Sequence, residues 1–311
     1  MNDLKTYFSL GISVGLLYPE AQISEQRHLS AFTKTAQLAG YETLETFLSN
    51  DPAIRKAEIS IAKEEGKIIN YNFPADFQLG GEFDPSSKNP VFRKKALDLA
   101  KKHVDYAQEA GSKVIGMTSG IDHGEENRTE SMNYFAEYMD VLSAYAQQAG
   151  ITLTLEPVER GIFKNLLLGP TADICAFIQK MQQMGHDNVA VLFDTAHMPL
   201  MKEDPIESVR LAHTVGIGHI HIGNAILSND RNPLYGHCHA PIGIMEGEYD
   251  WMDVSRFFKE LIDLGHLSSQ PTQEKKCISL EMAPYAGISP ELSAAVAYEK
   301  VQNAWKQAIE A

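Results

Sequence analysis

Four short apolar runs each end in a side chain of a type that commonly binds metal ions. Each run is typical of a buried parallel strand, and the chemistry of α/β proteins is placed where such strands end in loops. Two glutamates, an aspartate and a histidine suit a catalytic divalent ion with open positions better than a closed thiolate site. The runs are ITLTLE ending at Glu156, VAVLFD at Asp194, GHIH at His221 and CISLE at Glu281.

Strand-like and helix-like patterns alternate along the whole chain. Eight strand–helix units in 311 residues favour a closed (β/α)8 TIM barrel over an open sheet, and nothing in the composition marks a second domain, so we expect one domain over residues 1–311. Before the four runs, the predicted strands are Ser9–Leu16, Tyr41–Leu48, Lys67–Phe73 and Lys113–Met117. The predicted helices are Glu25–Ala39, Asp51–Glu65, Pro90–Ala110, Thr129–Ala149, Thr171–Met184, Pro205–Val215, Asp250–Leu264 and Pro290–Glu310, with Asp51 and Asp250 as N-caps.

In such a barrel the strand ends converge on one face, so residues distant in sequence can share one ion. The four ligand-type residues would end strands five to eight, which are consecutive around the ring. Taken singly, a carboxylate at a strand end serves more often as a helix cap or salt-bridge partner. The joint pattern predicts a metal centre. Residues Asn224–Gly247 form one long stretch without helical character, and loops of this length are often functional.

The segments around these residues resemble the sugar isomerase/epimerase superfamily of xylose isomerase-like TIM barrels. They are LEPVER, FDTAHM, GHIHIG and SLEMAPY, and their pattern is most similar to the ketose 3-epimerases of the D-tagatose and D-psicose type. The superfamily also includes hydroxypyruvate isomerase and inosose dehydratase. The resemblance implies that Glu156, Asp194, His221 and Glu281 bind one divalent metal ion, with Mn²⁺ favoured and Mg²⁺, Co²⁺ or Zn²⁺ accepted by such ligands. It also implies that Glu156 and Glu281 are the acid/base pair, and that homodimers and homotetramers are common.

The chemistry expected of such a site agrees with the resemblance. A divalent ion that chelates a hydroxyl and an adjacent carbonyl acidifies the neighbouring C–H and stabilises a cis-enediolate. A glutamate on one face can take the proton, and one on the opposite face can return it with inverted stereochemistry. A 1,2-isomerase would return the proton to the adjacent carbon. We therefore expect a metal-dependent isomerase or epimerase of a small carbohydrate.

Other polar residues are candidates for substrate contacts. His197 matches a histidine that contacts substrate oxygens in the resembling family, and His239 resembles a loop histidine that binds the substrate or a second ion. The 3-epimerases carry an arginine six residues after the ligand histidine. Leu227 stands there in this chain, with Arg231 nearby as a substitute. Candidates by position alone are Asn72, Ser119 and Glu45, whereas Glu159 and Arg160 are expected to form a surface ion pair.

Composition limits the alternatives. A formal net charge of −14 argues against a nucleic-acid or anionic-membrane partner, and three scattered cysteines fit a reducing compartment. The chain has no run of 18 apolar residues and no basic leader, so a cytoplasmic protein is expected. The open alternatives are an inosose-type dehydratase, a non-catalytic sugar-binding barrel and an endonuclease IV-like DNA repair enzyme. The last needs histidines at the ends of strands three and four, where Asn72 and Ser119 stand.

Overall fold

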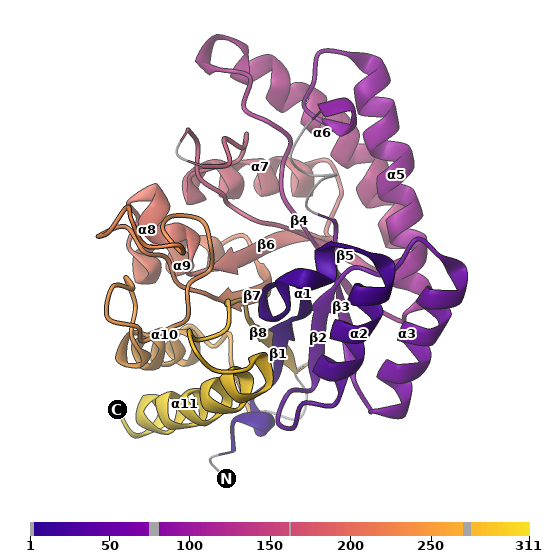
Figure 1. The fold of residues 1–311 in the computed structure, drawn as a ribbon. Helices are drawn as coiled ribbons and strands as arrows, with labels where there is room; N and C mark the ends of the chain where they lie inside the picture. Colours follow the sequence, from indigo (N-terminus) through magenta and orange to yellow (C-terminus); the bar gives the residue numbers. More distant parts are fainter. Residues whose placement is uncertain (1–2, 75–80, 162, 270–274) are drawn as a thin grey trace. The chain divides into compact units, whose positions relative to one another are not determined.

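Eight parallel strands form a closed barrel in the computed structural model, which describes residues 3–74, 81–161, 163–269 and 275–311 (Figure 1). The strands follow one another around the barrel in chain order, from β1 to β8. The (β/α)8 fold class predicted from the sequence is therefore confirmed. The strands are β1 (Phe8–Ser13), β2 (Thr43–Thr46), β3 (Ile68–Asn72), β4 (Val114–Met117), β5 (Thr152–Leu155), β6 (Val189–Asp194), β7 (Ile217–Ile222) and β8 (Lys276–Leu280).

The chain divides into two compact units. The first comprises Met1–Ile69, Asp204–Glu207 and Ile220–Ala311. In it, β1 pairs with β2 on one side and with β8 on the other, and Gly11 of β1 is in register with both Thr43 and Ser279. The helices of this unit are α1 (Val14–Leu17), α2 (Glu25–Ala36), α3 (Pro52–Glu64), α10 (Trp251–Asp263) and α11 (Pro290–Glu310).

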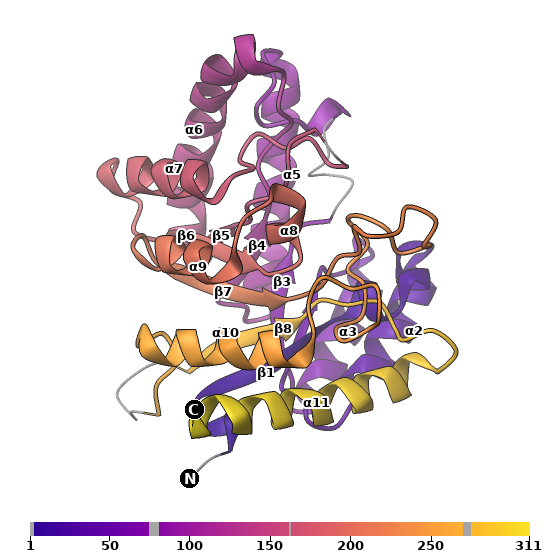
Figure 2. The same ribbon diagram turned by 90° about the vertical axis from the view of Figure 1, so that its left-hand side faces the viewer.

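The core of the first unit contains aromatic rings packed beneath its C-terminal helices. Trp305 of α11 is almost fully buried, and its ring centroid lies 5.4 Å from that of Phe8 and 5.7 Å from that of Phe258. The two edge-on contacts join β1, α10 and α11, and Figure 2 shows these two helices side by side. Large buried aromatic surfaces of this kind supply much of the hydrophobic free energy of folding.

The second unit comprises Asn70–Glu203 and Ser208–His219. Its strands pair in the order β3, β4, β5, β6, with Asn72 beside Gly116 and Leu155 beside Val191. Its helices are α5 (Pro90–Glu109), α6 (Glu125–Gln148), α7 (Thr171–Gln183), α8 (His197–Met201) and most of α9 (Pro205–His213). The long helices α5 and α6 pack against each other.

Capping residues set the starts of several helices, as the sequence predicted. The Asp51 side chain accepts hydrogen bonds from the backbone N–H groups of Ala53 and Ile54, with Pro52 at the first helical position. Asp250 forms a capping box with Asp253. Each cap satisfies N–H groups that have no partner within their own helix, so both N-cap predictions are confirmed.

Two short helices differ from the expectations. The predicted strand Ser9–Leu16 ends at Ser13, and the chain turns at once into α1. The run is apolar on both sides of this turn, and a short apolar run does not distinguish strand from helix by its periodicity. The five-residue helix α8 was not predicted because it is too short to show a helical repeat. Among the described helices, none is long and apolar enough to cross a membrane.

Candidate functional site

The four ligand-type residues lie at the C-terminal ends of β5 to β8. Glu156 directly follows β5, Asp194 is the last residue of β6, His221 is the next to last of β7, and Glu281 directly follows β8. Parallel strands present their C-terminal ends at one edge of a sheet, which is where α/β proteins place catalytic groups. Two of these residues belong to each unit, and the two half-sites are described in turn.

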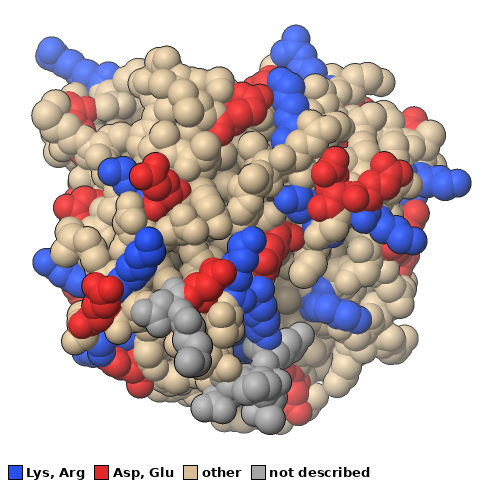
Figure 3. All heavy atoms as spheres, turned by 90° about the horizontal axis from the view of Figure 1, so that it is seen from below, with Lys and Arg blue, Asp and Glu red and all other residues tan. Residues whose placement is uncertain are grey.

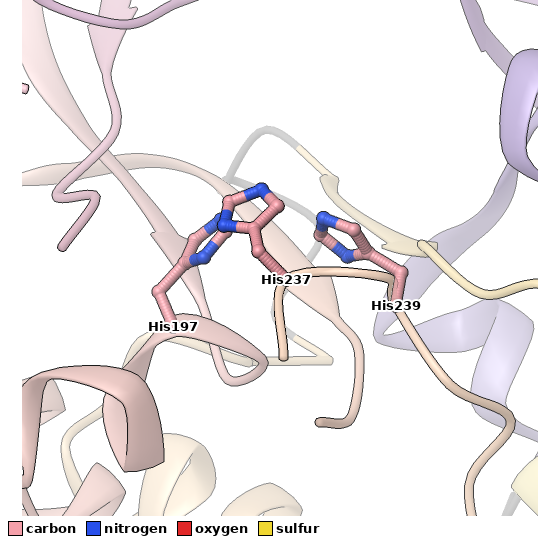
Figure 4. Close-up of side chains that lie close together, drawn as sticks. All are labelled: His197, His237 and His239. Atoms are coloured by element: carbon pink, nitrogen blue, oxygen red, sulfur yellow. The ribbon is translucent and has the colours of Figure 1, made fainter. Parts of the chain in front are cut away.

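In the second unit, His197 lies between the carboxylates that end β5 and β6. Its Nε2 forms a hydrogen bond with Glu156 Oε1 at 3.1 Å and lies 3.5 Å from Asp194 Oδ2. The other oxygen of Asp194 accepts a hydrogen bond from the backbone N–H of Ala196 at 2.7 Å, which fixes the carboxylate. His197 begins α8, so this short helix carries the imidazole to the strand ends (Figure 4). The substrate candidate His197 therefore adjoins both predicted ligands of its unit.

The negative surroundings of His197 govern its protonation. Burial alone lowers the pKa of this imidazole, but Glu156 and Asp194, with Glu159 farther away, outweigh that effect and raise its pKa to about 9. At neutral pH the ring is therefore an imidazolium that supplies positive charge to a buried, acidic half-site.

Glu159 and Arg160 do not form the predicted surface ion pair. Glu159 is buried, with Oε2 3.8 Å from His197 Nδ1. Arg160 instead forms an ion pair with Asp173 at 2.6 Å and hydrogen-bonds to a backbone carbonyl. The sequence does not show that Glu159 is buried, because its partner, His197, comes from a distant part of the chain. Sequence reasoning thus missed Glu159 as a third carboxylate of this half-site.

In the first unit, the ring of His221 lies between two glutamates. Its Nδ1 is 2.5 Å from Glu281 Oε2, and its Nε2 is 3.3 Å from Glu45 Oε1. Glu45 is only 1% exposed, whereas the side chain of Glu281 is 16% exposed. Strand β2 carries Glu45, which was a candidate substrate contact by position alone. Its place beside His221 was not readable from the sequence, because no local motif links β2 to β7.

The long loop after β7 is held by hydrogen bonds through one buried amide. The side chain of Asn224 donates to the carbonyls of Pro241 and Tyr249 and accepts from the Tyr249 N–H. The loop carries His239, a predicted substrate residue, in a left-handed conformation with φ of 48° that disfavours non-glycine residues. Its ring meets that of His237 edge-on at 5.1 Å, as drawn in Figure 4. The backbone carbonyl of His239 accepts a hydrogen bond from the N–H of Ala283, just after β8.

The other two substrate candidates have contrasting environments. Asn72 ends β3, and a Cβ added to the neighbouring Gly116 of β4 would overlap its Oδ1, so the amide lies over the glycine. That buried Oδ1 accepts no hydrogen bond from the described residues, which leaves an acceptor for a ligand. Arg231 is exposed on the loop after β7, where its backbone N–H donates to Asn229.

The donor set of each half-site fits a divalent cation. A buried carboxylate is expensive unless a positive group or hydrogen bonds compensate it. In the second unit, three carboxylates surround one imidazolium, and in the first unit two carboxylates surround one imidazole. Oxygen ligands with one or two imidazole nitrogens are typical of Mn²⁺, Mg²⁺, Co²⁺ and Zn²⁺ sites with catalytic roles. No thiolate is part of either half-site among the described residues.

Comparisons with known proteins agree with the fold. Residues 33–268 match the family model of the xylose isomerase-like TIM barrel. A crystal structure of a D-tagatose 3-epimerase-like protein superposes with a TM-score of 0.72 at 17% identity, covering 96% of this chain and 98% of that one. At this identity the likeness concerns the fold.

Two curated relatives match shorter stretches. D-psicose 3-epimerase of Agrobacterium fabrum is 32% identical over 100 residues, which is 32% of this chain and 32% of that protein. Inosose dehydratase of Erwinia tasmaniensis is 25% identical over 210 residues, which is 65% of this chain and 62% of that protein. In each case the match spans less than two thirds of the relative's length.

Proposed function

The chain belongs to the family of xylose isomerase-like TIM barrels, and from this premise we propose that it is a metal-dependent isomerase or epimerase of a small carbohydrate. The observation that carries the proposal is the pair of acidic, imidazole-containing half-sites at the C-terminal ends of four consecutive strands. The similarity to a D-psicose 3-epimerase supports a ketose or a related hydroxy-keto compound as the substrate.

We propose that the two half-sites share one divalent ion. Its ligands would be Glu156 and Asp194 from the second unit and His221 and Glu281 from the first, the four residues that match the metal ligands of the resembling family. When bound, such an ion polarises the substrate carbonyl and an adjacent hydroxyl. The C–H of the carbon that bears this hydroxyl then becomes more acidic. Manganese remains our favoured ion, and a cytoplasmic homodimer or homotetramer remains our expectation for the assembly.

The chain's own residues would then move the proton and hold the sugar. Glu156 would take a proton from one face of the substrate, and Glu281 would deliver one to the opposite face with inversion. His197, which lies beside Glu156 and Asp194, would donate a hydrogen bond to a substrate oxygen. The remaining substrate contacts would come from Asn72, His239 and Arg231.

A lyase is the second candidate, favoured by the match to an inosose dehydratase. After the same proton abstraction, the enediolate would expel a β-hydroxyl as water and would not be reprotonated. The product would then be lighter by one water and would absorb in the near ultraviolet. Mass spectrometry of the product therefore separates the two candidates.

A DNA repair activity has weaker support. Asn72 and Ser119 stand where the three-metal enzymes need histidines, and Ser119 Oγ is already engaged by the backbone N–H of Leu168 at 2.9 Å. The net charge is −14, and Figure 3 shows a face on which basic and acidic side chains are interspersed. Tight phosphate-backbone binding requires a concentrated positive surface.

Solvent deuterium exchange tests the proposal most directly. The purified protein, after elemental analysis for bound metal, is incubated in D₂O with a panel of ketoses and cyclitol ketones. We expect deuterium at the carbon next to the carbonyl, lost after chelation of the metal and lost in Glu156→Gln. Exchange that survives both treatments would contradict the metal-dependent mechanism. Tight sugar binding without exchange, unchanged by Glu156→Gln, would indicate a non-catalytic sugar-binding barrel.

A further inference from the structure

Glu45 is a buried carboxylate that the proposed reaction does not use. It lies on β2, is 1% exposed, and places Oε1 3.3 Å from His221 Nε2. The other ring nitrogen of His221 faces Glu281 at 2.5 Å. The two nitrogens of one imidazole thus face two different carboxylates, Glu45 fully buried and Glu281 with 16% of its side chain exposed.

The second oxygen of Glu45 is held by a hydroxyl from a neighbouring strand. Ser279 Oγ donates a hydrogen bond to Glu45 Oε2 at 2.9 Å. Ser279 lies on β8 directly beside His221 of β7 in the strand register. The carboxylate is therefore fixed at one oxygen by the residue next to the histidine, while the other oxygen points to the imidazole.

A glycine on the intervening strand makes this contact across strands feasible. Gly11 of β1 lies in register between Thr43 of β2 and Ser279 of β8. A Cβ at Gly11 would overlap Ser279 Oγ, the atom that holds Glu45. Because residue 11 has no side chain, the side chains of Glu45 and Ser279 can meet over β1.

These contacts have a chemical consequence for the histidine. A neutral imidazole binds a metal through the nitrogen without a proton, and a hydrogen bond at the other nitrogen decides which one that is. We propose that Glu45 is a positioning residue, which accepts the Nε2–H of His221 and so presents Nδ1, next to Glu281, to the cation. This inference rests on the metal centre proposed above.

The arrangement predicts graded effects on metal affinity. Glu45→Leu removes the proposed acceptor of Nε2–H, so we expect Mn²⁺ and Zn²⁺ affinity to fall by roughly 10- to 100-fold, the usual effect of losing such a partner. Glu45→Gln keeps an acceptor oxygen and should lose less. Glu58→Gln is the matched control, because Glu58 is an equally buried glutamate in the same unit that hydrogen-bonds a different histidine, His28. It should leave the affinity unchanged.

Two further measurements separate positioning from ligation. Proton–nitrogen correlation spectra of histidine-labelled, Zn²⁺-loaded protein should show an Nε2–H on His221 that exchanges slowly with solvent, and faster exchange of this proton in Glu45→Leu. The absorption spectrum of the Co²⁺-loaded protein should keep its band positions and intensity in Glu45→Leu, because no ligand is lost.

The outcomes are distinct. Unchanged affinity and an unchanged exchange rate of the His221 Nε2–H in Glu45→Leu would overturn the role of Glu45 while leaving the metal centre intact. A Co²⁺ spectrum that shows a lost ligand would also overturn it, because Glu45 would then bind the metal itself. A wild-type protein that binds none of these ions would instead refute the proposed function, and the inference with it.

Discussion

Two buried histidine–glutamate pairs in the first unit have opposite surroundings. His28 forms a hydrogen bond through Nδ1 with Glu58 at 2.7 Å and through Nε2 with Thr46 at 3.2 Å. Glu58 also accepts from the backbone N–H of Ser49. At the strand ends, His221 faces Glu45 and a second carboxylate, Glu281.

The difference concerns charge compensation. The pair at His28 is closed by a hydroxyl and a backbone N–H, and its ring stacks on Phe47 with centroids 4.6 Å apart. The pair at His221 concentrates two carboxylates around one imidazole, which a bound cation would offset. The first arrangement stabilises the fold, and the second is suited to binding a metal.

The largest expected effect is on turnover. Replacing Glu281 by Gln removes the carboxylate that distinguishes the two pairs, so we expect the catalysed deuterium exchange to fall by about 10²- to 10⁴-fold. Glu58→Gln should keep wild-type turnover in its folded fraction. Steady-state rates with each variant saturated in metal provide the measurement, and equal losses in the two variants would contradict the distinction.

The next effect is on folding stability. Glu58→Leu leaves His28 and the Ser49 N–H without their acceptor, so we expect the free energy of unfolding to fall by about 3 kcal/mol. Glu45→Leu removes a buried charge close to Glu281 and should change the free energy of unfolding of the metal-free protein by less than about 1 kcal/mol. Urea denaturation measures both variants. A larger loss in Glu45→Leu would show that its pair, too, is mainly structural.

A third buried histidine, in the second unit, has a neutral partner. His103 Nδ1 lies 2.6 Å from the hydroxyl of Tyr71, and burial, with a smaller effect of Lys102, lowers the pKa of His103 to about 4. Because the unfolded chain binds this proton more readily, the contribution is fully present above about pH 6.5 and is lost as the pH falls towards 4.

The wild-type free energy of unfolding should therefore fall by about 2 kcal/mol more than that of His103→Gln between pH 7 and pH 5. Denaturation curves at the two pH values test this. Parallel losses in the two proteins would mean that His103 is charged in the folded state.

The smallest expected effect comes from Gly11. In Gly11→Ala the added methyl would displace Ser279 Oγ and with it Glu45, so we expect Mn²⁺ affinity to fall by about 10-fold, at the lower end of the loss for an outer partner. Gly15→Ala is the control, because a Cβ there would meet only Gln22 Nε2, at an ordinary 3.6 Å. Titration with a competing chelator gives both affinities, and equal values for the two variants would contradict this account of Gly11.

Much of the barrel could be predicted because its signals are local. Each strand is a short apolar run, and caps such as Asp51 and Asp250 mark the helix starts within a few residues. The short helices α1 and α8 could not be predicted, because four or five residues show no helical repeat.

The candidate site also contains residues that could be predicted from the sequence and residues that could not. Glu156, Asp194 and Glu281 could be selected because each terminates an apolar run. Their assembly around one ion, and the single domain over residues 1–311, stay predictions. The parts played by Glu45 and Glu159 depend on contacts with histidines from other strands and loops, which no local pattern records.

The vacant side-chain position on β1 also bears on how this sequence can evolve. A Cβ at residue 11 would overlap Ser279 Oγ, the atom that donates to Glu45, so a larger residue at 11 requires a smaller residue at 279 in the same lineage. A single substitution at any of the three positions would impair the local packing until a second substitution restored it. We therefore expect the three positions to covary among homologues, and a chain with alanine at 11 to lack the acidic residue at 45.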